Sequence, residues 1–301
     1  MYQILTRSKD LNDPVLGNMF LNRLGLHAWR VALADRCTAW RRRSADIDPG
    51  WQQAIQRDGF LVIKEFLPTD AFQALKGEAE EAISQSRADG QGSPHGGRGF
   101  GKKQARPWGF DRYDGGTLNR FVSIDPGSHR EAAAFRSLKS LRELSVAVAG
   151  RAQKPQHVWY YLTRHGTEGD HEDPQKRFHR DTFFSSQKFW YFLHPVTRDD
   201  GPFEYVPGSH KVTRRRLAWE QAQAMQALKR PRGKRGASFR IDAAEIDAMG
   251  FGPARQLTVP ANTLVIADTF GFHRRGSAKA GAERLAMYGN MRPWPFAPLR
   301  F

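Results

Sequence analysis

The stretch Phe178-His179-Arg180-Asp181-Thr182-Phe183 places a histidine and a carboxylate two positions apart in an aromatic-rich run. Because side chains alternate faces along a β-strand, His179 and Asp181 are predicted to point the same way, and Arg180 to point to the opposite face. Aromatic residues favour strands, so this run and the following Phe189–Leu193 predict a rigid β scaffold. Two such side chains could bind one metal ion.

A second histidine, His273, follows the short apolar run Thr263–Ile266, which predicts another strand. Two histidines and one carboxylate form a ligand face that leaves further positions of an iron ion open, as in non-haem Fe(II) oxygenases. His179, Asp181 and His273 are therefore the candidate iron ligands and catalytic centre. Arg284 lies in a further strand-like run, and its planar guanidinium could hold a carboxylate through two hydrogen bonds.

Two other histidines compete for these roles. His171 and Asp173 have the same spacing, but the polar run Thr167–Lys176 around them contains Gly and Pro and is typical of a loop. His210 ends the run Pro207-Gly208-Ser209-His210, which indicates a turn, so a structural role is expected for it. Neither histidine has a distant partner that completes a ligand set as His273 does.

Taken together, these features resemble the phytanoyl-CoA dioxygenase family of Fe(II)/2-oxoglutarate oxygenases. The resemblance covers roughly residues 51 to 293, and within the wider family the chain looks most similar to the bacterial Kdo 3-hydroxylases. The residues that carry it are Asp58–Pro68 (DGFLVIKEFLP), His179 with Asp181, Gly201–Lys211 (GPFEYVPGSHK), and His273 with Arg284.

The resemblance implies a mainly β fold with flanking helices, whose core is a double-stranded β-helix of the jelly-roll or cupin-like type. It implies that His179, Asp181 and His273 bind iron and that Arg284 binds the 5-carboxylate of 2-oxoglutarate. With 2-oxoglutarate and O2 as cosubstrates, oxidative decarboxylation yields succinate, carbon dioxide and an oxidant able to attack a C–H bond. The carboxylate of Asp181 favours hydroxylation, because halogenating relatives have a small residue there.

Length and composition fit one catalytic domain with an appendage. The chain has 301 residues and 40% hydrophobic content. We expect residues 1–50 to form a basic, partly amphipathic N-terminal helical segment, and residues 51–301 to form the oxygenase domain with a basic helical insertion near 212–250. The single Cys37 suits a reducing cytoplasm, and no apolar run has the length needed to span a bilayer.

Local patterns predict the elements around these motifs. The expected elements are a helix over 14–44, a strand at Phe60–Ile63, a helix at Thr69–Ser86, a long loop over Gly90–Gly116, a strand at Val158–Leu162 and a helix at Val212–Ala227.

The formal net charge of +16 indicates an anionic partner. Basic residues concentrate in Arg41–Arg43, Arg98–Arg106, Arg214–Arg216 and Lys229–Arg235. The last two runs lie in the expected insertion, between the two halves of the candidate metal site, where this kind of fold carries substrate-facing lids.

Large apolar residues within residues 1–50 stand among arginines. This mixture suits a helix at a lipid headgroup boundary, and packing against the catalytic domain is the alternative. We therefore expect a hydroxylase of an anionic glycolipid, specifically the Kdo sugar of Kdo-lipid A in the lipopolysaccharide inner core, that is cytoplasmic and peripheral at the inner membrane face. A hydroxylase of an acyl-CoA or other small anionic metabolite is a second hypothesis. A nucleic-acid oxygenase or a non-catalytic basic module is a third, disfavoured because the chain has no recognised nucleic-acid-binding motif.

Overall fold

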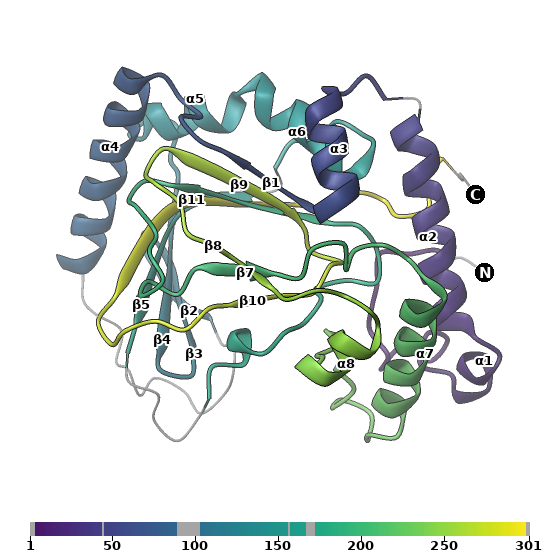
Figure 1. Ribbon diagram of the computed structural model, residues 1–301. Helices are drawn as coiled ribbons and strands as arrows, with labels where there is room; N and C mark the ends of the chain where they lie inside the picture. Colours follow the sequence, from purple (N-terminus) through teal and green to yellow (C-terminus); the bar gives the residue numbers. More distant parts are fainter. Residues whose placement is uncertain are drawn as a thin grey trace.

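The computed structural model describes residues 4–43, 45–88, 103–155, 157–166, 172–236 and 238–298. Its centre is a large antiparallel sheet with the strand order β1-β9-β6-β11-β5-β4-β3-β2 (Figure 1). These strands are β1 (Phe60–Ile63), β2 (Lys103–Arg106), β3 (Gly109–Asp114), β4 (Thr117–Ser123), β5 (His157–His165), β6 (Gln187–Phe192), β9 (Thr263–Asp268) and β11 (Glu283–Met291).

A smaller antiparallel sheet, in the order β10-β7-β8, faces the large one. It consists of β7 (Phe203–Tyr205), β8 (Arg255–Leu257) and β10 (His273–Arg275). Side chains from both sheets pack between them into an aromatic core that includes Phe121, Trp190, Phe203 and Tyr205. The result is the double-stranded β-helix predicted from the sequence, a sandwich of two sheets with helices outside.

Four helices cover the outer face of the large sheet (Figure 1). They are α3 (Pro49–Asp58), α4 (Thr69–Ala88), α5 (Arg130–Ser137) and α6 (Lys139–Ala149). Their buried residues, among them Leu75, Phe135 and Leu144, share a core with outward-facing strand residues such as Tyr191 and Ile266. Because this packing buries the far side of the large sheet, the inner face is left for the site.

The remaining helices gather beside one end of the sandwich (Figure 1). These are α1 (Met19–Arg23), α2 (Leu26–Arg43), α7 (Arg214–Leu228) and α8 (Ala243–Ala248), with a short 3-10 helix at Pro174–Lys176. The predicted helix over 14–44 is thus two helices, broken at Gly25, whose φ of 94° is a left-handed conformation that favours glycine. No described helix has both the length and the apolar character that crossing a bilayer requires.

Two glycines allow the close packing that supports the site. A Cβ on Gly271 would lie 1.8 Å from the hydroxyl oxygen of Tyr205, and one on Gly59 would lie 2.5 Å from the same atom. That hydroxyl donates a hydrogen bond of 2.8 Å to the backbone carbonyl of Asp268, so Tyr205 occupies the space that side chains would need. Larger residues at 59 or 271 would displace the turn that leads into His273.

The predicted strand at Phe60–Ile63 is confirmed as β1. The predicted strand at Val158–Leu162 lies within β5, and the predicted helix at Thr69–Ser86 lies within α4. The helix predicted at Val212–Ala227 is α7, which begins two residues later. The predicted loop over Gly90–Gly116 is wrong in its second part, because Lys103–Arg106 and Gly109–Asp114 pair as a β-hairpin. Residues 90–102 of that run lie outside the described residues. The boundary proposed near residue 50 stays a prediction.

Candidate metal and cosubstrate site

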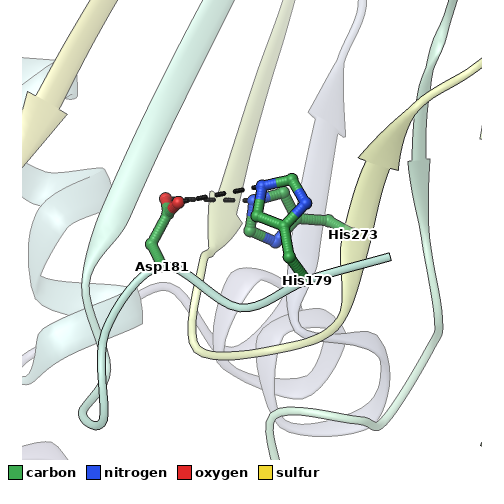
Figure 2. A group of neighbouring side chains, drawn as sticks. All are labelled: His179, Asp181 and His273. Atoms are coloured by element: carbon green, nitrogen blue, oxygen red, sulfur yellow. Dashed lines mark ion pairs between the residues drawn. The ribbon is translucent and has the colours of Figure 1, made fainter. Parts of the chain in front are cut away.

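The structure brings His179, Asp181 and His273 together (Figure 2). One ligand atom from each of the three side chains lies within 4.8 Å of the other two. The Asp181 carboxylate oxygens lie 3.9 Å from Nε2 of His179 and 3.8 Å from Nε2 of His273. Metal bonds of about 2.0–2.2 Å would reach both members of each of these pairs, so the cluster can hold one metal ion.

The histidine rings are fixed in the orientation that a metal needs. Nδ1 of His179 lies 2.8 Å from the carbonyl oxygen of Arg177, and Nδ1 of His273 lies 2.9 Å from that of Gly271. A carbonyl can only accept, so each Nδ1 carries the proton and each Nε2 keeps its lone pair. Both lone pairs then face Asp181. Carbonyl partners of this kind orient metal-binding histidines in known sites.

The protonation states of the three side chains also suit a metal. Burial, together with the neighbouring His273, lowers the pKa of His179 to about 3, and burial lowers the pKa of His273 as well. Both rings are therefore neutral near pH 7. Burial alone would raise the pKa of Asp181, but the Lys188 ammonium, 2.7 Å from its Oδ2, and the two imidazoles hold this pKa well below its usual range. The cluster offers two neutral nitrogens and one carboxylate.

His179 and Asp181 do not lie in a regular strand, so that detail of the prediction is wrong. His179 forms isolated antiparallel bridges with His273 and Arg240, and Asp181 follows in a bend. The two histidines exchange both backbone hydrogen bonds, each 3.0 Å long. This direct backbone pairing sets the distance between the histidines, and it explains why residues so far apart in the sequence share one site.

Arg180 does point away from the side chains of His179, Asp181 and His273, as predicted. Its guanidinium is fully buried and pairs with both carboxylate oxygens of Glu220 on α7, at 2.9 and 2.6 Å. Arg216 also pairs with Glu220, at 3.1 Å, and its guanidinium lies 3.9 Å from the ring centre of Phe272, the residue before His273. Glu220 thus connects the two chain segments that carry His179 and His273.

Arg284 lines the same cavity as His179, Asp181 and His273. This cavity has a volume of about 300 Å³, and it is also lined by Tyr161, Lys188 and Trp190. Arg284 is 6% exposed and donates a hydrogen bond to the carbonyl of Gly201. No carboxylate among the described residues lies within ion-pair distance of its guanidinium. A buried cation of this kind can bind the carboxylate of a ligand.

Sequence reasoning missed the other cations of this cavity, which are Lys9, Arg112, Arg274, Arg275 and Arg292. Only Arg275 carried a usable signal, since it stands two positions after His273 on β10 and so faces the same way. The basic runs, which were expected to meet an anionic partner, are partly structural instead. Arg41 and Arg216 are buried and bind backbone carbonyls, whereas Arg232 and Lys234 are exposed.

The outcome differs for the two histidines that competed for the metal site. His171 lies outside the described residues, and Asp173 is buried in an ion pair with Arg275. His210 lies in the expected turn, is 6% exposed, and lines a different cavity from the metal cluster. Neither Asp173 nor His210 belongs to the cluster of possible metal ligands.

A double-stranded β-helix with two histidines and one carboxylate on its inner face, beside a buried arginine, defines the class of non-haem Fe(II) and 2-oxoglutarate-dependent oxygenases. The phytanoyl-CoA dioxygenase (PhyH) family matches residues 55–242, more than half of the chain. The chain belongs to this family and is an Fe(II)/2-oxoglutarate-dependent dioxygenase. The matched range contains His179 and Asp181, and the fold adds His273 from beyond it.

The solved structure of AviO1 agrees with this fold, and two further solved structures show a weaker likeness to the chain. AviO1 from Streptomyces viridochromogenes Tue57 is 18% identical, with a TM-score of 0.50 over 83% of this chain and 97% of that chain. The epimerase SnoN, in complex with Fe3+, alpha ketoglutarate and nogalamycin RO, is 14% identical, with a TM-score of 0.48 over 82% and 88%. HygX from Streptomyces hygroscopicus, with nickel and 2-oxoglutarate bound, is 14% identical, with a TM-score of 0.47 over 81% and 87%. No significant match to a curated protein was found.

Proposed function

We propose that this dioxygenase hydroxylates an anionic glycolipid at a membrane surface, with the Kdo sugar of Kdo-lipid A as the specific substrate. In this proposal His179, Asp181 and His273 bind Fe(II), and Arg284 binds the distal carboxylate of 2-oxoglutarate. Bound iron and 2-oxoglutarate supply the oxidant that breaks a substrate C–H bond when O2 reacts. Lys188 holds the Asp181 carboxylate in place through the 2.7 Å ion pair.

The observation that carries the proposal is the positive charge of the cavity. Seven cationic side chains line it, and Asp181 is its one acidic lining residue within the described part of the chain. Four of these cations have carboxylate partners: Arg112 pairs with Asp114, Lys188 with Asp181, Arg274 with Glu204 and Arg275 with Asp173. The remaining charge favours a substrate that carries carboxylates or phosphates.

Cavity size supports a sugar headgroup rather than a whole lipid. A volume of about 300 Å³ lies at the lower end of the range of small-molecule pockets, and 2-oxoglutarate must share it. Acyl chains would therefore stay outside, at the membrane, while a sugar acid enters the cavity. A small anionic metabolite would satisfy the charge of the cavity equally well.

Exposed apolar side chains beside exposed arginines support the lipid over the metabolite. The exposed large apolar side chains of the described residues all lie in the N-terminal helical region or near the other chain end: Phe20, Leu24, Trp29, Trp40 and Trp294, between 40% and 71% exposed. Exposed arginines accompany them on α1 and α2, among them Arg23, Arg36 and Arg43. Aromatic and basic residues together favour the interface of an anionic bilayer.

The test is to incubate the iron-loaded protein with 2-oxoglutarate, O2 and Kdo-lipid A, and to measure both succinate and the lipid mass. The proposal predicts succinate release with a gain of one oxygen atom in the Kdo part of the lipid. Parallel reactions contain an acyl-CoA or single-stranded DNA. Oxidation of either of these, with Kdo-lipid A unchanged, would reject the glycolipid substrate and leave the enzyme class intact.

A further inference from the structure

Residues 4–17, here called the N-terminal segment, have no helix or strand but are firmly held. Arg30 on α2, 2% exposed, donates hydrogen bonds of 2.8, 2.9 and 2.8 Å to the carbonyls of Ile4, Thr6 and Ser8. Its guanidinium also lies 4.1 Å from the ring centre of Phe183. One buried arginine therefore fixes the path of three alternate residues of this segment.

The second half of the N-terminal segment is anchored to the insertion. Leu11 is 2% exposed and packs in a core with Trp219 and Phe272. The Arg235 guanidinium donates to the carbonyl of Leu11 at 3.3 Å, and the backbone N–H of Gly233 donates to the Asn12 side chain at 2.6 Å. The segment is thus fixed on both sides of Lys9.

Lys9 is delivered to the wall of the active-site cavity. Its ammonium donates to the backbone carbonyl of Asp181, and to the hydroxyl of Ser238 at 2.6 Å. An ammonium has three donors, so one donor is left after these two contacts. Arg292, another residue of the cavity wall, is linked to the same segment, because Arg7 donates to its carbonyl at 3.0 Å.

Charge balance gives Lys9 a role. Among the cavity cations, Lys9, Arg284 and Arg292 have no carboxylate of the described residues within ion-pair distance. Arg284 is taken by the cosubstrate in the proposed function, so Lys9 and Arg292 are left to face the substrate. Lys9 is partly buried, and a partly buried cation without a carboxylate partner is costly to keep, so an incoming anion relieves that cost.

We propose that Lys9, held at the cavity wall by the N-terminal segment, is a specificity-determining residue that binds an oxyanion of the primary substrate, a phosphate or a carboxylate. The proposal rests on the proposed function, since it assumes that the substrate enters the cavity beside the metal. Arg292 supplies the second cation for the same oxyanion.

The test uses sugar probes in place of the full substrate. Glucose 6-phosphate, glucuronate and uncharged glucose are titrated calorimetrically into the full chain, loaded anaerobically with Fe(II) and 2-oxoglutarate. The charged probe that binds identifies the oxyanion as phosphate or carboxylate. The variants are Lys9→Met, which keeps the apolar stem, and the matched control Lys139→Met, whose side chain is 88% exposed. Arg30→Met is a third variant, which loosens the segment without altering a residue that lines the cavity.

We expect at least one charged probe, and not glucose, to bind the wild type and the Lys139 variant, and to bind about tenfold or more weakly to the Lys9 variant, as the loss of a charged hydrogen bond implies. Arg30→Met should weaken the binding of the same probe. Unchanged affinity in Lys9→Met, or failure of both charged probes to bind the wild type, would overturn the proposal. Binding of 2-oxoglutarate is measured separately. A failure of 2-oxoglutarate to bind would count against the proposed function and not against the role of Lys9.

Discussion

Arg180, the residue between two candidate iron ligands, forms a fully buried ion pair with Glu220, whose Oε2 lies 2.6 Å from its guanidinium. Glu220 also lies 2.9 Å from Nε2 of His27 on α2. The helix α2, the helix α7 and the chain segment that carries His179 and Asp181 are therefore joined through one carboxylate. Burial and this pairing oppose each other at Glu220, and the paired cations win, so that its pKa is lowered.

Glu220→Gln should destabilise the protein strongly. Arg180 and Arg216 would lose their shared counter-ion in a site with no solvent exposure, which typically costs about 3–5 kcal/mol. Urea unfolding measures this free energy. The matched control Glu143→Gln removes an exposed carboxylate paired with Lys139, and should cost about 0.5 kcal/mol or less. Similar losses in the two variants would show that Glu220 is not the connecting residue described above.

Arg284→Met should weaken 2-oxoglutarate binding by about 10- to 100-fold and leave Fe(II) binding intact, because it removes a charged, bidentate donor from the cavity. The dissociation constants come from anaerobic titrations of Fe(II) and then of 2-oxoglutarate. Arg164→Met is the control, since Arg164 lies opposite Glu283 on the neighbouring strand β5 but is 48% exposed. Equal cosubstrate affinity in Arg284→Met and Arg164→Met would reject the role of Arg284.

Acid should destabilise the fold through His210. Burial lowers the pKa of His210 to about 3, whereas an unfolded histidine has a pKa near 6.5. Below pH 6.5 the unfolded state therefore binds a proton that the folded state does not, so this part of the stability is present above pH 6.5 and is lost as the pH falls. Between pH 6 and 4 the unfolding free energy falls with pH in both proteins. In His210→Gln this slope should be smaller than in the wild type by about 1.4 kcal/mol per pH unit. Parallel slopes for the variant and the wild type would contradict this assignment.

Replacing Trp29 and Trp40 by alanine should reduce binding to anionic vesicles. Both side chains are about half exposed, at 50% and 54%, so their loss removes interfacial contacts with little cost in stability. Flotation with phosphatidylglycerol vesicles measures the bound fraction, and phosphatidylcholine vesicles test the contribution of charge. Equal flotation of the variant and the wild type would remove the support that these residues give to a lipid substrate.

Much of the site could be predicted from short spacings. His179 and Asp181 are neighbours in an aromatic run, and His273 follows a β-branched strand, so the local pattern already indicated three ligands on one β scaffold. The resemblance to the family added Arg284 and the sandwich. The strand β9, which precedes the turn into His273, was predictable because it is largely apolar and every one of its residues is buried.

The remaining features depend on contacts that leave no local trace. The β2–β3 hairpin was missed because its basic residues and nearby glycines are typical of loops, and its place is fixed only by pairing with β4. Lys9 meets Asp181 from 172 positions away, and Glu220 meets Arg180 from 40 positions away. Charge runs in the sequence pointed instead to Arg41 and Arg216, whose burial arises from tertiary packing alone.

The most direct test of the iron and 2-oxoglutarate site is an anaerobic titration of Fe(II), with 2-oxoglutarate present, into the wild type, His273→Ala and the control His194→Ala. His194 is 42% exposed and pairs with Glu80, away from the cluster. We predict about one bound iron and the visible charge-transfer absorption of the Fe(II)–2-oxoglutarate complex in the wild type and the control, with both lost in His273→Ala. A folded His273→Ala protein that keeps the iron and the absorption would contradict the site.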